Sequence, residues 1–312
     1  MLDNRCGNAV KERLFHVHLG TLLSMPMSPR AQGYAFALAA PVCWSFGGVV
    51  MRTVDAGPWD IVFWRAIAHL AVFPLVLAVL FKTPILRRMV DAGTVGLASG
   101  LLIAGIFVFH VIAMTSTTVA NALLLQSTAP VLTALIAWLV LREKVPFANW
   151  IAIAIAFAGL AIVIGGKFDG GDIFGKAMAV AVALCGATNA TLIGHFRKLD
   201  LLPATLVGAA FAAAIGIAFG DVFAVGALDI VALVGLGLLQ ITIGLTLFYK
   251  ALETLSPVEV SLIALLEPVL GPLWTFFAVG EEPATSTLVG GGVLISALAF
   301  NTLASASAKA RR

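Results

Sequence analysis

The chain has 312 residues, of which 61% are hydrophobic and only 11% are charged, against roughly 25% charged residues in an ordinary soluble domain. These few charged side chains could not cover that much apolar surface. The composition therefore excludes a soluble globular protein. The net charge of +3 comes from short basic clusters between apolar runs, which excludes the continuous basic surface of a nucleic-acid-binding protein. The class that remains is an integral membrane protein.

Ten segments are each close in length to the roughly 20 apolar residues that cross a bilayer. In chain order they are residues 33–51, 61–81, 93–114, 116–141, 148–166, 173–194, 201–220, 227–249, 255–280 and 284–304. Because several connections are only a few residues long, consecutive spans must be antiparallel neighbours. We therefore expect an all-α integral membrane protein with ten transmembrane helices.

Segments that do not span the membrane precede and follow the ten spans. We expect residues 1–30 to form a disordered cytoplasmic leader, with two alternatives: a signal peptide, or an upstream start with Met27 as the true first residue. Residues 305–312 are expected to form a basic cytoplasmic tail.

Basic residues in the connections predict the orientation, because Lys and Arg gather on the cytoplasmic side of a membrane. With the N-terminus inside, the inner segments hold 15 Lys and Arg residues, whereas the outer segments hold 3, namely Arg52, Lys167 and Lys176. This asymmetry predicts a multi-pass protein of the cell (inner) membrane with both termini in the cytoplasm.

The last five spans repeat the first five. Identical residues at an offset of 138 or 142 positions are Ala113 and Ala251, Leu124 and Leu262, Pro130 and Pro268, Glu143 and Glu281, Gly33 and Gly175, and Cys43 and Cys185. Each half, 31–166 and 173–304, has an odd number of spans, so the halves must cross the membrane in opposite senses. Inverted repeats are typical of secondary transporters with a site near the bilayer midplane. A duplication that only stabilises a bundle is the alternative.

Short motifs in both halves resemble the drug/metabolite transporter superfamily, in its ten-helix EamA-like branch. The matching pieces are Trp44–Gly47, Phe63–Arg65, Ala120–Ala122, Leu141–Glu143, Leu255–Glu259, Leu266–Val269, Val279–Glu281 and Gly290–Gly292. The resemblance covers about residues 33–304. It implies a membrane transporter of the kind that exports amino acids, aromatic compounds or other metabolites, whereas more distant branches carry sugars and nucleotide sugars.

Four ionisable side chains inside spans are candidates for function, because a charge there costs on the order of 3 kcal/mol or more unless it faces protein or water. Glu267 is a candidate for gating or proton coupling, because its repeat counterpart is Ala129 and fold symmetry does not require an acid there. Arg65, one helical turn before His69, is a candidate partner of the solute or of Glu267, and snorkelling to the headgroups is the alternative. His110 is a further gating candidate, with hydrogen-bonded helix packing as its alternative.

Uncharged polar and aromatic residues complete the candidate site. The substrate-binding candidates are Trp44, Asn121, Gln126, Asn189, Gln240, Tyr249 and Trp274. Pro130 and Pro268 lack a backbone N–H and predict helix breaks in the fourth and ninth spans. A solute path needs a few hydrogen-bonding groups on an apolar and aromatic wall. Each side chain could equally hold helices together, at about 0.6 kcal/mol per hydrogen bond.

The predicted function is secondary transport by alternating access, in which a small metabolite, an amino acid or an aromatic compound, moves outward. Neither a catalytic set nor metal-ligand spacing is visible, so we expect no enzyme activity, no metal and no other cofactor. A membrane-embedded enzyme and a non-transporting scaffold are the alternatives. The expected partners are a small-molecule solute, membrane lipid and, as a candidate coupling ion, the proton, but no nucleic acid. The sequence leaves the oligomeric state open.

Overall fold

The computed structural model describes residues 28–80, 85–117, 119–142, 144–164, 173–279 and 285–310. The predicted leader up to residue 27, the last two residues of the predicted tail and the glutamate pair Glu143 and Glu281 lie outside the described residues. Within that part of the chain the secondary structure is helical, and the helices form ten spans in the predicted order. The structure therefore confirms a ten-helix membrane protein.

Six spans are single helices. They are α4 (Pro58–Leu80), α5 (Ile85–Ser116), α8 (Phe147–Ile164), α9 (Ile173–His195), α10 (Ala204–Phe219) and α15 (Thr285–Ala310). α5 begins eight residues before the predicted span, because helical residues 85–92 precede a kink at Gly93, where φ is +52°. Glycine adopts this left-handed conformation without a side-chain clash. The predicted start at residue 93 thus marks the kink inside the helix.

The other four spans are interrupted. The first consists of α2 (Pro29–Ser45) and α3 (Gly47–Thr53), and the fourth of α6 (Val119–Gln126) and α7 (Ala129–Leu139). The eighth contains a π-helical segment, η1 (Gly237–Gly244), between α11 (Ala227–Leu236) and α12 (Leu245–Leu252). The ninth consists of α13 (Pro257–Ala264) and α14 (Glu267–Val279).

The breaks in the fourth and ninth spans are equivalent in the two halves. α7 begins one residue before Pro130, and α14 begins one residue before Pro268. A proline fits the first turn of a helix, where its missing N–H needs no partner, but it interrupts a helix that arrives from the N-terminal side. The same chemistry at the same repeat position therefore produces two matching breaks.

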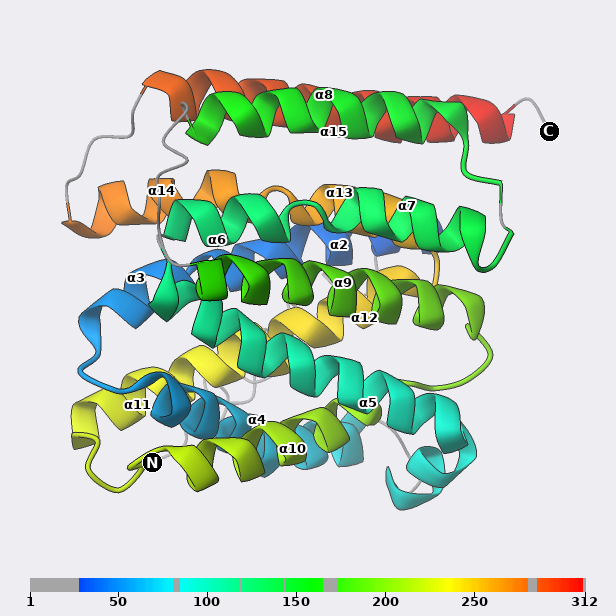
Figure 1. The fold of residues 1–312 in the computed structure, drawn as a ribbon. Coiled ribbons are helices and arrows are strands. Elements are labelled where there is room, and N and C mark those ends of the chain that lie inside the picture. The colour runs from blue at the N-terminus through cyan, green and yellow to red at the C-terminus, as the bar shows by residue number, and fades with distance from the viewer. Residues whose placement is uncertain are drawn as a thin grey trace, which may run out of the picture.

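Packing between the halves follows the twofold pattern of an inverted repeat. α8 and α15 lie side by side along one edge of the bundle, and α4 and α10 pack together at the opposite edge (Figure 1). α5 packs on α9 just as its repeat counterpart α12 packs on α2, and α7 packs on α9 as α14 packs on α2. Each half therefore packs against the other with equivalent helices. The broken fourth and ninth spans contact each other through α7 and α13.

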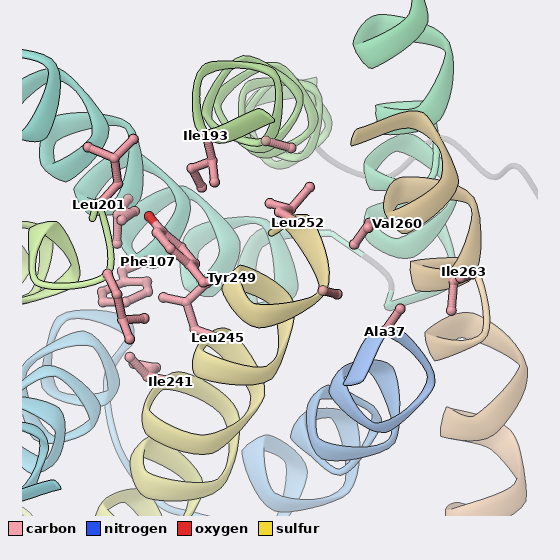
Figure 2. Packing of buried hydrophobic residues seen from close by; sticks show 14 of the residues in the cluster. Ala37, Phe107, Ile193, Leu201, Ile241, Leu245, Tyr249, Leu252, Val260 and Ile263 are labelled. Atoms are coloured by element: carbon pink, nitrogen blue, oxygen red, sulfur yellow. The ribbon is translucent and has the colours of Figure 1, made fainter. Parts of the chain in front are cut away.

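Apolar side chains of the eighth span fill the space between the halves. Figure 2 shows Ile241, Leu245 and Tyr249 projecting from one side of that span towards Phe107 of α5. Tyr249 is only 4% exposed. Full burial of such side chains stabilises a fold by about 1.5–3 kcal/mol each where water is the alternative solvent. Inside a bilayer, close packing replaces that term.

His69 has a structural role in this core. It is fully buried, its Nδ1 lies 3.0 Å from the Thr242 hydroxyl, and its Nε2 lies 3.0 Å from the Thr205 hydroxyl. Its ring stacks on Phe73 with 4.5 Å between the ring centroids. Because both ring nitrogens are satisfied by hydroxyl groups, His69 joins α4, η1 and α10 and does not face a solute path.

Ion pairs join the halves near the ends of several helices. Arg30 of α2 donates to the Glu259 carboxylate of α13 over 2.5 Å, and the Tyr34 hydroxyl donates to the same oxygen over 3.0 Å. Arg88 of α5 pairs with Asp200 in the connection between α9 and α10. These charges lie on residues of opposite halves, so they tie the two repeats to each other.

Candidate functional site

A cavity of about 200 Å³ lies between the two halves. Its wall contains residues from both helix breaks, including Ser127 and Ala129 in the first half and Leu265 and Glu267 in the second. Apolar side chains make up much of the remaining wall, namely Ile106, Phe107, Leu123, Val182, Ile241, Leu245 and Phe248. The cavity is therefore a mainly apolar chamber with polar groups at defined points, as small-molecule sites are.

Nine of the residues predicted for the site lie on this wall. They are Trp44, Arg65, His110, Gln126, Pro130, Asn189, Gln240, Glu267 and Pro268. These positions are spread over seven spans, and only the packing of the two halves brings them to one chamber.

Arg65 is held by a neighbour from the opposite half. Its side chain is 5% exposed, and its Nη2 donates to Gln240 Oε1 over 2.6 Å. The Gln240 amide nitrogen in turn donates to the main-chain oxygen of Trp44 over 2.5 Å. Arg65 Nε is buried and has no hydrogen-bond partner among the described residues. A buried cation with an unsatisfied donor can bind a carboxylate or another strong acceptor.

Glu267 supplies the opposite charge on the same wall. It is the first residue of α14, so its carboxylate lies where the helix dipole stabilises a negative charge. Arg65 is near enough to attract it electrostatically. Among the described residues, however, neither a hydrogen bond nor an ion pair joins Glu267 to a partner. An ion pair between Arg65 and Glu267, one of the two alternatives that the sequence left open, is thus not formed in this conformation, because Arg65 is bonded to Gln240 instead.

A second unsatisfied donor belongs to Gln126 at the end of α6. The Gln126 Oε1 atom lies 2.9 Å from Nδ1 of His110, whereas its buried Nε2 has no partner within the part of the chain that the structure describes. His110 therefore makes the hydrogen bond expected of a helix-packing histidine while it also faces the cavity. Gln126, which also lines the cavity, keeps an amide donor that is unsatisfied within the described residues.

Tyr249 lies behind the cavity wall, in contrast to the prediction. Its hydroxyl lies 3.1 Å from the Ser99 hydroxyl and accepts a hydrogen bond from Asn189 Nδ2 over 3.2 Å. Ser99 also donates to Asn189 Oδ1 over 2.7 Å. Of these three residues only Asn189 lines the cavity, so Tyr249 and Ser99 orient the Asn189 amide. Ser99 was not predicted, although it is a hydroxyl residue inside an apolar span, beside Gly100.

Trp274 also lies away from the predicted position. Its ring stacks on Phe46 with 4.7 Å between centroids, and its Nε1 donates to the Ser45 hydroxyl over 2.6 Å. These contacts fasten α14 to the break in the first span, so Trp274 does not line the cavity. The side chain of Asn121 lies outside the described residues.

Two wall hydroxyls carried no sequence signal of their own. Ser127 bonds the Leu123 carbonyl over 2.6 Å, and the Ser261 hydroxyl lies 3.1 Å from that of Thr133 in the opposite half. Serine is common where polar groups hold membrane helices together, so only the tertiary structure distinguishes a wall position from a packing position.

Known proteins resemble this chain in sequence and in fold. The sequence pattern of the EamA-like transporter family matches residues 31–165 and again residues 173–303. A protein of Archaeoglobus fulgidus named as an uncharacterized transporter is 24% identical over 273 residues, which cover 83% of this chain and 92% of that protein. One solved crystal structure superposes with a TM-score of 0.76 and 18% sequence identity, over 88% of this chain and 98% of that chain. Because the family pattern covers both repeats and most of the sequence, the chain belongs to the EamA-like transporter family.

Proposed function

We propose that this protein is a secondary transporter that exports a small amino-acid-like metabolite across the cell (inner) membrane by alternating access. The observation that carries the proposal is the pair of opposite charges on the cavity wall, Arg65 and Glu267, which are not bonded to each other. A solute with both a carboxylate and an ammonium group would satisfy both charges. We expect the carboxylate at Arg65 and Gln126 Nε2, which offer unsatisfied donors, and the ammonium at Glu267.

The size and lining of the cavity support this class of solute. Its volume of about 200 Å³ is below the roughly 300–1,000 Å³ of sites for drug-sized ligands. The aromatic rings of Trp44, Phe107 and Phe248 and the aliphatic wall around them suit an apolar or aromatic side chain. Amino acids with such side chains are therefore the first compounds to test.

Symmetry supports alternating access as the mechanism. Two halves of the same fold in opposite orientations can exchange conformations. One arrangement of the two halves then opens the cavity inward, and the exchanged arrangement opens it outward. The matching breaks before Pro130 and Pro268 give each half a short segment that can move separately. The outward direction of net transport follows from the resemblance to exporters, and the proton is the candidate coupling ion, with Glu267 as the proposed carrier.

The basic connections support cytoplasmic termini and an inner-membrane location. The connection between α7 and α8, that between α9 and α10, and the C-terminal end of α15 lie at the same end of the bundle, on the right in Figure 1. The α7–α8 connection contains Arg142 and Lys144, and the α9–α10 connection contains Arg197 and Lys198. Positive charge at one end of a bundle favours the cytoplasmic side.

Flux into proteoliposomes tests the proposal. Purified protein is reconstituted and offered radiolabelled amino acids and aromatic metabolites, with and without an imposed pH gradient. We expect saturable flux of at least one apolar or aromatic amino acid above that of protein-free liposomes. Arg65→Met should abolish it, because the substitution removes the cation but keeps a long apolar side chain.

Inside-out and right-side-out membrane vesicles then distinguish export from import. Folded protein that moves none of these solutes would contradict the proposal and favour a scaffold. Chemical conversion of a solute in place of its movement would favour a membrane-embedded enzyme.

A further inference from the structure

The side chain of Gln240 is engaged on both sides of its amide. Its Oε1 accepts from Arg65 Nη2 over 2.6 Å, its Nε2 donates to the Trp44 main-chain oxygen over 2.5 Å, and the residue is 4% exposed. Its own main-chain oxygen accepts from Trp44 Nε1 over 3.0 Å. These three bonds connect α4 of the first half, the end of α2 and η1 of the second half. Gln240 is thus the common partner of the cavity cation and the first-span break.

Helix geometry provides both ends of this connection. α2 ends at Ser45, so the carbonyl of Trp44 is one of the last four carbonyls of a helix, which lack normal intrahelical partners. Gln240 lies in the π-helical segment, where the Leu245 N–H bonds the Gln240 carbonyl five residues earlier. One extra residue per turn shifts the side chains that follow relative to a regular α-helix, and such segments occur frequently at functional sites.

Three glycines leave the space that the connection needs. A Cβ atom at Gly47 would overlap the Gln240 side-chain amide, and one at Gly237 would overlap the backbone of Arg65. A Cβ atom at Gly244 would overlap the indole of Trp44. The close approach of α2, α3, α4 and η1 therefore depends on side chains that are absent at these positions.

We infer that Gln240 is a positioning residue that acts through Arg65: it fixes the guanidinium so that its unsatisfied Nε faces the solute carboxylate. The inference rests on the proposed function and replaces the sequence-based expectation that Gln240 binds the solute. An arginine side chain has several rotatable bonds, so fixing it before the solute arrives lowers the entropy cost of binding. Specificity for a carboxylate would then depend on a residue that does not itself bind the carboxylate.

Inhibition constants separate positioning from direct contact. The assay is counterflow of radiolabelled L-phenylalanine in proteoliposomes, inhibited by L-phenylalanine, by 3-phenylpropionate, which lacks the ammonium, and by phenethylamine, which lacks the carboxylate. For Gln240→Met we expect the inhibition constants of L-phenylalanine and 3-phenylpropionate, which both carry a carboxylate, to rise at least about tenfold. This factor corresponds to the loss of one charge-assisted hydrogen bond. The constant for phenethylamine should change less than about twofold.

A double variant and a second substitution complete the test. Because Arg65→Met should abolish flux, this comparison uses direct binding of radiolabelled 3-phenylpropionate to the purified proteins. If Gln240 acts through Arg65, the variant carrying both Arg65→Met and Gln240→Met should bind 3-phenylpropionate no more weakly than Arg65→Met alone. Gln240→Glu preserves the acceptor but puts a carboxylate against the guanidinium, so it should also weaken carboxylate binding. Thr191→Val is the matched control, since Thr191 is buried and, among the described residues, its hydroxyl bonds only the Ala187 carbonyl of its own helix.

The outcomes are distinguishable. Equal rises in the inhibition constants of all three compounds would show that Gln240 only packs the helices. If the double variant weakened binding by the product of the two single effects, Gln240 would contact the solute itself. Either result overturns the inference. Counterflow that persists with normal carboxylate binding in Gln240→Glu overturns it as well. Absence of L-phenylalanine counterflow in the wild type, with the protein folded, would instead contradict the proposed solute class.

Discussion

Replacement of Glu267 by glutamine tests the acidic half of the candidate site. The substitution keeps the shape and hydrogen-bonding capacity of the side chain and removes its charge. Glu267 has no hydrogen bond or ion pair among the described residues, so the protein loses few contacts of its own. The favourable interaction with the helix N-terminus is weakened, at a cost of at most about 1 kcal/mol.

The main effect should therefore be on the solute. A hydrogen bond to a charged group contributes about 1.5–3 kcal/mol, and about 1.4 kcal/mol corresponds to a factor of ten. The KM for an amino acid should accordingly rise about 10- to 150-fold in Glu267→Gln. Arg65 would remain as the uncompensated charge on the wall, so a carboxylate without an ammonium group should bind more tightly than in the wild type.

Proteoliposome flux and inhibition by 3-phenylpropionate measure both changes. If Glu267 carries a proton during transport, an imposed pH gradient should accelerate the wild type and leave the variant unaffected. Among the described residues, the other titratable groups on the wall are Arg65 and His110, so His110→Gln serves as the matched control for pH dependence. A Glu267→Gln variant with the wild-type KM, rate and pH dependence would show that the acid is structural and that the reasoning is wrong.

Three further predictions concern topology, the connection at Gln240 and the core. In a cysteine-free background, Asp169→Cys should react with an impermeant thiol reagent on intact cells, and Arg87→Cys only after lysis, because loop charge predicts that residue 169 lies outside. The reverse labelling would invert the predicted topology. Gly47→Ala should weaken inhibition by carboxylates as Gln240→Met is expected to do, since the added methyl displaces the Gln240 amide, and unchanged inhibition constants would contradict the role of this close contact. His69→Leu should lower stability by about 2–4 kcal/mol, because the buried hydroxyls of Thr242 and Thr205 each lose their hydrogen bond to the imidazole, and a thermal unfolding midpoint in detergent equal to that of the wild type would refute this.

Much of the fold was accessible from composition and repetition. Apolar runs of about 20 residues predict spans because a bilayer offers no partners for an irregular backbone. The offset that aligns Pro130 with Pro268 predicted matching helix breaks, and the structure has breaks immediately before both prolines. These features are local or periodic, so they appear in the sequence without knowledge of which helices touch.

The composition of the site was only partly accessible. A charged residue inside a span indicates a functional position, because burying a charge in the membrane costs free energy. Arg65 and Glu267, both identified in this way, lie on the cavity wall. Tyr249 and Ser99 show why polarity alone does not identify wall residues. A polar side chain at mid-span can equally lie behind the wall and orient a neighbour. Burial direction depends on the rotation of each helix against partners that are remote in the sequence.

The sequence by itself determined the membrane class, the ten spans, the duplicated halves and the intramembrane charges, because each of these follows from hydrophobicity or from a fixed offset along the chain. Only the tertiary structure decided that Arg65 bonds to Gln240 and not to Glu267. That choice depends on the π-helical winding of residues 237–244 and on close helix approach at Gly47, Gly237 and Gly244. Such contacts join residues up to about 200 positions apart, and no local pattern specifies them, because they result from the packing of the two halves as a whole.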